Sequence, residues 1–123
     1  MGILDIKEVS LLQNYHKHTS QSNIWGFKDS AAVYEDYAKR AVELGHKVIS
    51  SVEHGWQARY HEPYELAKKY DLKFVFGTEA YWVKDRHAKD RTNSHIVILA
   101  KNEKGRRAIN SILSIANEDG YYF

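Results

Sequence analysis

The feature that most constrains the fold of this chain is its alternation of short apolar segments with amphipathic helical segments. Four segments have the β-branched, aromatic and apolar content of strands: 10–18, 46–53, 73–83 and 94–100. Three segments carry apolar residues at the three-to-four spacing of a helix: 30–45, 62–70 and 102–120. The order β-α-β-α-β-β-α predicts an α/β fold with a mainly parallel sheet, either layered or closed into a barrel.

Local signals refine this outline. Ser30 is expected to cap the first helix and Gly45 to end it, and Pro63 suits the first turn of the second helix. Gly77 is expected to interrupt or bend the third strand. The segment 94–100 is mostly apolar, which is typical of a strand buried on both faces.

The composition limits the class of protein. A chain of 123 residues without a repeat or linker predicts a single domain over 1–123. It has no cysteine, which excludes disulfides and thiolate ligands, and no apolar run approaches the ~20 residues that span a bilayer. No secretory signal is recognised at its start, so a cytoplasmic location is expected. A net charge of +2 does not by itself indicate nucleic-acid binding.

The stretch "NYHKHTS" places two histidines one residue apart, near the end of the first expected strand. Side chains alternate between the faces of a strand, so His16 and His18 would point the same way, roughly 6.5–7 Å apart. Two imidazoles on one face can share a metal ion or flank a pair of ions. A single histidine at a strand end is more often a surface or hydrogen-bonded residue.

Every expected strand carries a metal-competent side chain at or near an end. These residues are His16, His18, Glu53, His54, Glu79 and His95. Imidazoles and carboxylates without cysteine suit Zn, Mn or Fe, and they favour a catalytic site over a structural zinc site. From the residues alone, the set best suited to metal binding is His16, His18, His54 and Glu79. His46, His61 and His87 are better explained as loop or capping residues.

A charged loop follows the third expected strand. Its basic residues could contact phosphates: Lys84, Arg86, Lys89 and Arg91. Three tryptophans could stack on bases: Trp25, Trp56 and Trp82. The competing interpretation is a solvated surface loop whose acids partly cancel its charge, with Trp82 half-buried in a strand.

Four stretches resemble the PHP (polymerase and histidinol phosphatase) family. They are "YHKHTSQS", "AKRAVELGHKVISSVEHG", "YELAKKYDLKFVFGTEAYWV" and "HIVILAKNEKGRRAINSILSIANEDGYYF", in family order and covering nearly the whole chain from about residue 13. The last stretch looks like the polymerase branch, the N-terminal PHP domain of bacterial or phage DNA polymerase III alpha subunits.

The resemblance implies a (β/α)7-type barrel with up to three divalent metal ions. It also implies that His16 and His18 match the first motif, Glu53 and His54 the second, Glu79 the third, and His95 a later ligand position. In this family such clusters hydrolyse phosphoesters, and the polymerase branch implies a 3′–5′ exonuclease within a DNA-synthesising transferase.

Three departures from the family pattern bear on this expectation. Glu53 stands where the family usually has Asp, which moves the carboxylate by about one methylene. Asp29 resembles an acidic loop position of polymerase members but is not expected to be a ligand. The late Asp-x-His motif is absent, and four strands cannot close the barrel, so we expect a partial barrel whose open edge is covered by the rest of a polymerase chain or by a second copy.

Two functions therefore compete. The first is a metal-dependent phosphoesterase domain that acts on DNA ends in replication. The alternative is a catalytically silent, metal-stabilised module that binds DNA or a polymerase partner. The histidine set favours the first function, whereas the missing motif and the Glu53 exchange favour the second.

Overall fold

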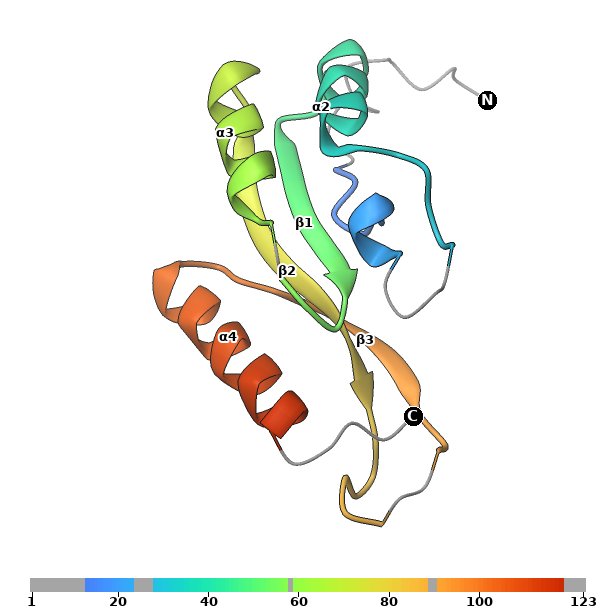
Figure 1. Ribbon diagram of the computed structural model, residues 1–123. Coiled ribbons are helices and arrows are strands. Elements are labelled where there is room, and N and C mark those ends of the chain that lie inside the picture. Colours follow the sequence, from blue (N-terminus) through green and yellow to red (C-terminus); the bar gives the residue numbers. More distant parts are fainter. Residues whose placement is uncertain (1–12, 24–27, 58, 89–90, 119–123) are drawn as a thin grey trace, which may run out of the picture.

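The computed structural model describes residues 13–23, 28–57, 59–88 and 91–118 (Figure 1). Its elements are the 3-10 helix η1 (Ser20–Ser22), α2 (Tyr34–Glu43), β1 (Val48–His54), α3 (His61–Lys69), β2 (Lys73–Trp82), β3 (Ser94–Leu99) and α4 (Glu103–Glu118). The predicted α/β class and the predicted element order from the first helix onward are confirmed. No helix among the described residues is both long enough and apolar enough to cross a membrane.

The three strands form one mixed sheet in the order β1-β2-β3. β1 and β2 are parallel, in a register that pairs His54 with Glu79, because α3 carries the chain back across the sheet between them. β2 and β3 are antiparallel, with Tyr81 opposite His95. The expected parallel arrangement therefore holds for β1 and β2 only, since β3 follows β2 as a hairpin.

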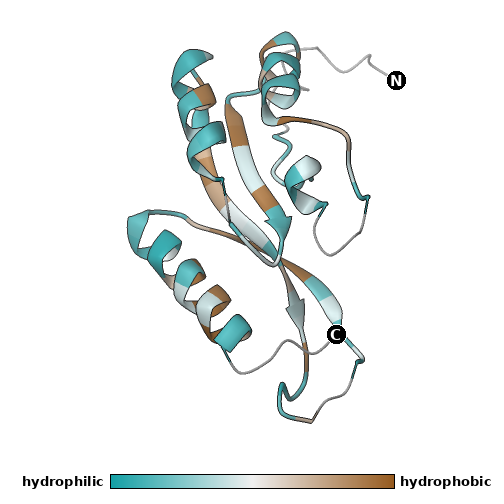
Figure 2. Ribbon diagram, in the orientation of Figure 1, coloured by the Kyte–Doolittle hydropathy of each residue, from teal (hydrophilic) through white to brown (hydrophobic). Residues whose placement is uncertain are grey.

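Two helices cover one face of the sheet around a small apolar core. Ala38 of α2 and Ala67 of α3 pack with Ile49 of β1, and all three are buried. Larger apolar side chains surround this cluster: Leu66, Tyr70, Leu72 and Phe74. Alanine at the contact positions lets both helices approach β1 closely, and Figure 2 shows brown, apolar residues on that strand between white and teal ones.

The segment expected to form the first strand is not a strand in its described part, 13–18. It lies against β1 through side-chain contacts instead of a backbone ladder. Ser50 Oγ donates to the Tyr15 carbonyl at 2.6 Å, and Lys47 N donates to Gln13 Oε1 at 2.8 Å. Residues 10–12 lie outside the described part of the chain.

β3 is not buried on both faces, contrary to expectation. Ile96, Val97 and Leu99 are each about two-fifths exposed, because β3 ends the described sheet and has a neighbour on one side only. The apolar stripe of α4 is likewise only partly covered: Ile109 is buried, whereas Ile112 is exposed.

The helix and strand bounds differ from the sequence signals at two points. α2 begins at Tyr34 with Val33 as its N-cap, and the Ser30 hydroxyl instead donates to the His18 carbonyl at 3.1 Å. β2 continues through Gly77 without interruption. Gly45 has φ 71°, which confirms its predicted role as the left-handed residue after the helix.

Candidate metal centre

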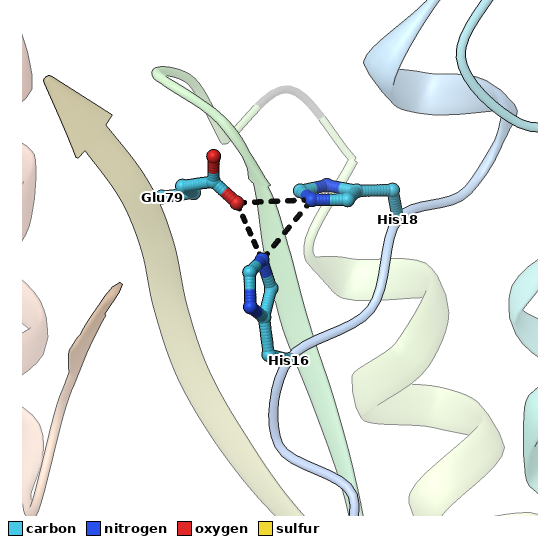
Figure 3. A group of neighbouring side chains, drawn as sticks. All are labelled: His16, His18 and Glu79. Atoms are coloured by element: carbon cyan, nitrogen blue, oxygen red, sulfur yellow. Dashed lines mark hydrogen bonds and ion pairs between the residues drawn. The ribbon is translucent and has the colours of Figure 1, made fainter. Parts of the chain in front are cut away.

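The carboxylate of Glu79 is the centre of the site. It projects from β2, is 3% exposed, and its Oε2 faces two histidines of the 13–18 segment (Figure 3). His18 Nε2 lies 3.0 Å from this oxygen, and His16 Nε2 is in short hydrogen-bonding contact with it. The two imidazole nitrogens are 3.1 Å apart, so three potential ligand atoms converge on one point.

The second oxygen of Glu79 faces two further histidines. His95 Nδ1 of β3 lies 2.6 Å from Oε1, and His54 Nδ1 at the end of β1 lies 3.4 Å from it. The strand register explains this convergence, because His54 pairs with Glu79 and His95 pairs with Tyr81, two residues further along β2. Paired residues and residues two apart share a face of the sheet.

Asp29 adds a carboxylate that the sequence analysis did not count as a ligand. Its Oδ2 lies 3.3 Å from His54 Nε2, and His54 stacks on His18 with ring centroids 4.1 Å apart. Asn23 holds the Asp29 backbone, since its Oδ1 accepts from Asp29 N at 2.6 Å. No local periodicity marks a loop residue of this kind, so the resemblance to an acidic loop position was the only sequence signal.

Lys17 anchors the segment that presents His16 and His18. Its side chain is buried, and Nζ donates to Asn14 O at 2.6 Å and to Ser50 Oγ at 2.5 Å. Burial lowers the pKa of Lys17 to about 8, although the negative charge of Glu53 opposes this shift. The anchored lysine fixes which way the two histidines face.

Glu53 does not join the cluster, although it precedes His54 in sequence. Strand alternation turns its side chain to the helix-covered face, where it is 3% exposed. Its carboxylate accepts hydrogen bonds from Thr19 N at 3.2 Å, Thr19 Oγ1 at 2.5 Å, Tyr34 OH at 2.6 Å and Ser22 Oγ. Burial and the hydrogen bond to Glu53 raise the pKa of Tyr34, which therefore remains a donor.

The electrostatics of the cluster favour an ionised Glu79 beside a neutral His18. Burial alone would raise the pKa of Glu79, but the hydrogen bond from His16 and the charges of His54 and His18 outweigh it, so the pKa is lowered. The pKa of His18 is lowered chiefly by burial and then by the neighbouring His54. A carboxylate among imidazoles with available lone pairs is a donor set for a divalent cation.

Two groups of side chains in the described chain have ligand atoms close enough to hold a metal ion. The groups are His16, His18 and Glu79, and His18, Asp29 and His54. Ligand atoms bound to one ion at about 2.0–2.1 Å lie roughly 3.0–3.4 Å apart, and the separations at His18 Nε2 match this range. In addition, His54 Nδ1 is buried without a hydrogen-bond partner among the described residues. The residues therefore fit a metal centre.

The other histidines and the basic loop lie outside the two metal-competent groups. Arg86 Nη2 donates to the Ile115 carbonyl of α4 at 2.8 Å, which ties the loop to that helix. Lys84 and Arg91 are exposed near the tip of the β2–β3 hairpin, and Lys89 lies outside the described residues.

The two tryptophans of the described chain differ in exposure. Trp56 is part-buried, and its Nε1 donates to the Gln21 carbonyl at 3.0 Å. Trp82 is 65% exposed instead of half-buried, because it is the last residue of β2. Trp25 lies outside the described residues.

A cavity of about 410 Å³ lies between α3 and the start of α4, on the helix-covered face of the sheet and opposite the face that carries Glu79. Phe74 and Phe76 form part of its wall and point away from Glu79, because they occupy alternate positions on β2. The metal-competent groups and this cavity are therefore separate features.

Comparison with known proteins places these residues in a family. The PHP-domain model matches residues 14–123. The DNA polymerase III alpha subunit of Aquifex aeolicus is 28% identical over 119 residues, and that of Helicobacter pylori is 30% identical over 121 residues. These matches cover 88% and 96% of this chain, respectively, and 10% of each relative.

A PolC-type polymerase is also similar. The PolC-type DNA polymerase III of Caldanaerobacter subterraneus is 31% identical over 85 residues, which is 69% of this chain and 6% of that protein. The chain thus spans about a tenth or less of the length of the curated relatives that it matches. With the family match over residues 14–123, these similarities show that the chain belongs to the PHP-domain family and is related to the PHP region of DNA polymerase III alpha subunits.

Proposed function

We propose that this chain is a single metal-dependent phosphoesterase domain that hydrolyses phosphodiesters at DNA ends, as a 3′–5′ exonuclease does. The observation that carries the proposal is the convergence of four imidazoles on the carboxylate of Glu79. They come from His16, His18, His54 and His95. A structural role does not require so many imidazoles around one buried acid.

The donor set supports divalent Zn, Mn or Fe. Glu79, His16 and His18 would hold one ion, and Asp29 and His54 would hold a second beside His18. Bound ions would supply Lewis acidity for attack on phosphorus and for neutralising the phosphoryl oxygens. The protein itself orients the donors: Lys17 fixes the strand-like segment, and the Tyr81 ring lies edge-on against His95 with centroids 4.9 Å apart.

The relatives support DNA as the substrate class, because their names describe DNA polymerases. Lys84 and Arg91 are exposed at the hairpin that follows Glu79, and with Arg86 and Lys89 they are our candidates for phosphate contacts. We expect single-stranded DNA binding to weaken with salt, and a Lys84→Gln/Arg91→Gln variant to reduce the salt slope by about 1–2. A salt slope near zero in the wild-type chain would remove this part of the proposal. A DNA substrate also implies a cytoplasmic location.

The exposed edge of β3 supports a covering partner. Ile96, Val97 and Leu99 stand beside a strand edge with no described neighbour, which suits strand pairing with the remainder of a polymerase chain or with a second copy. Light scattering after size exclusion separates these cases. A monomer across a wide concentration range would eliminate the second copy.

Metal content is the first test of the proposal. The untagged chain, never exposed to chelator, should carry at least one equivalent of Zn, Mn or Fe by mass spectrometry. A His16→Ala/His18→Ala variant should lose it, whereas His87→Ala, which changes a histidine outside the cluster, should retain it. Metal-free wild-type protein that takes up no ion on titration would contradict the proposal and favour the catalytically silent alternative.

Hydrolysis is the second test. Metal-loaded wild-type chain should cleave a generic phosphodiester and shorten a 3′ DNA end, and Glu79→Gln should abolish both activities. His87→Ala should leave them unchanged. Equal residual activity in wild type and Glu79→Gln would point to a contaminating nuclease.

A further inference from the structure

A buried serine connects the cluster to Glu53 on the other face of β1. Ser22 Oγ lies 3.2 Å from His18 Nδ1, and the same oxygen donates to Glu53 Oε2. Ser22 and Glu53 are both almost completely buried, so water does not compete for these groups. The chain of contacts therefore runs from Glu53 through Ser22 to the ring nitrogen of His18 that faces away from Glu79.

We propose that Ser22 and Glu53 act as positioning residues that set the tautomer of His18, with the proton on Nδ1 and the lone pair of Nε2 directed at the metal group. This inference rests on the proposed function in one respect only, which is that the lone pair of Nε2 binds a metal ion. Nothing in the sequence pattern of metal-competent residues pointed to Ser22.

The hydrogen count supports this assignment. A serine hydroxyl has one hydrogen, and Ser22 gives it to the Glu53 carboxylate. Toward His18, the Ser22 oxygen can then only accept, so the hydrogen between them must belong to Nδ1. A neutral imidazole with its hydrogen on Nδ1 has its lone pair on Nε2. Nε2 lies 3.0 Å from Glu79 Oε2, which is also an acceptor, so a cation bound by both atoms would complete this contact.

The surroundings of Glu53 keep it an acceptor. Tyr34 OH and Thr19 Oγ1 donate to Oε1, and Thr19 N donates to Oε2 beside Ser22. The Thr19 hydroxyl can donate here because its own oxygen accepts from Gln21 N at 3.1 Å. Four donors occupy the lone-pair positions of the carboxylate, so Glu53 accepts a hydrogen bond from Ser22 and does not donate one to it.

The arrangement gives Glu53 a role that differs from that of a metal ligand. Hydrogen bonds to the non-ligating nitrogen of a histidine fix its tautomer and ring orientation. Here a hydroxyl stands between the carboxylate and the imidazole.

The decisive experiment is the tautomer of His18 in the metal-free chain, read from two-bond ¹H–¹⁵N correlations at a mildly alkaline pH. Wild-type His18 should show the pattern of the Nδ1–H tautomer. Ser22→Ala should lose this preference, and Ser20→Ala, which changes an exposed serine of the same η1 turn, should keep it. An Nε2–H pattern in the wild type, or an unchanged Nδ1–H pattern in Ser22→Ala, would overturn the proposal.

A second measurement follows the consequence for binding. Calorimetric titration with Zn²⁺ or Mn²⁺ should give an affinity about 10–100-fold lower for Ser22→Ala than for wild type, with Ser20→Ala unchanged. Equal affinities for the two variants would contradict the proposed positioning role. Because the tautomer is read without metal and without substrate, absence of hydrolysis would count against the proposed function and leave the tautomer test intact.

Discussion

His18 and His54 stack face to face, with ring centroids 4.1 Å apart and planes inclined by 8°. Two imidazolium ions at this separation would repel each other, and burial penalises charge on His18 further. The stack is therefore favourable when His18 is neutral, which is also the form that binds a metal ion. Glu79 stands beside the stacked pair and would supply negative charge to a cation bound there.

Metal removal should lower the stability of the chain. A ligand that binds only the folded state stabilises it by about 2.7 kcal/mol at a free concentration of 100 times its Kd. Thermal unfolding followed by circular dichroism should shift to lower temperature when chelator is added and recover when Zn²⁺ or Mn²⁺ is restored. The His16→Ala/His18→Ala variant should show no such difference, and a chelator effect of equal size in that variant would place the responsible ion elsewhere.

The stability of the metal-free chain should rise with pH through the range in which His18 titrates. Its folded pKa is lowered from the ordinary value of 6.5, so the unfolded state binds more protons than the folded state between the two values. The free energy of unfolding is therefore smallest at the acid end and rises as the pH approaches and passes 6.5. Urea titrations should be made above the ordinary pKa of a glutamate, where Glu79 contributes little. A His18→Gln variant should show a shallower rise, and an identical slope would assign the effect to another group.

Gly77→Ala should destabilise the sheet. A Cβ at this position would lie 2.8 Å from the Ile98 carbonyl oxygen and 2.7 Å from Leu99 Cδ2, and the carbonyl cannot move without disturbing the β2–β3 pairing. Overpacking of this kind costs about 1–3 kcal/mol, which urea unfolding would measure.

Gly105→Ala is the matched control for that substitution. Its Cβ would meet Ala100 at ordinary contact distances of 3.4 and 3.5 Å, and Gly105 lies within α4. In a helix interior alanine is favoured over glycine by about 0.8–1.0 kcal/mol. Gly105 lies in the first turn, so we expect a smaller gain and a variant at least as stable as wild type. Equal effects of the two glycine substitutions would contradict the close approach of β2 and β3 at Gly77.

Tyr34→Phe should destabilise the chain by about 1–3 kcal/mol, because it leaves a buried carboxylate oxygen of Glu53 with one donor fewer. Tyr64→Phe removes a hydroxyl from an exposed ring and should change the free energy of unfolding by less than about 0.5 kcal/mol. Chemical denaturation of the two variants against wild type measures both values. Similar effects at the two positions would mean that the Glu53 hydrogen bonds add little to stability.

Much of the fold was predictable from the sequence because the signals are local. The helical spacing of Tyr34, Ala38 and Ala41 predicted the side of α2 that packs inward, and all three residues are buried. The position of Gly45 gave the end of the same helix, because a left-handed residue there costs glycine little. Strand β1 was recognisable from its β-branched residues, and its alternation also contained the signal that Glu53 and His54 face opposite ways.

The site was predictable in its residue types but not in its geometry. His16 and His18 share a face as expected, yet no strand ladder produces this arrangement in the described segment. Lys17, Ser50 and the Glu53 carboxylate hold the segment through contacts 31 to 34 residues apart. Asp29 reaches His54 from a loop, where no periodicity indicates direction.

The sequence by itself determined which segments are helices and strands and which side chains can bind a metal, because propensity, periodicity and ligand chemistry are properties of short stretches. Only the tertiary structure decided that β3 lies exposed and antiparallel to β2, that Glu53 supports the site from the opposite face, and that Asp29 adjoins it. An apolar run has the same sequence pattern at the centre and at the edge of a sheet. A loop residue has the same local sequence pattern near a site and far from it. Strand order and long-range hydrogen bonds make that distinction.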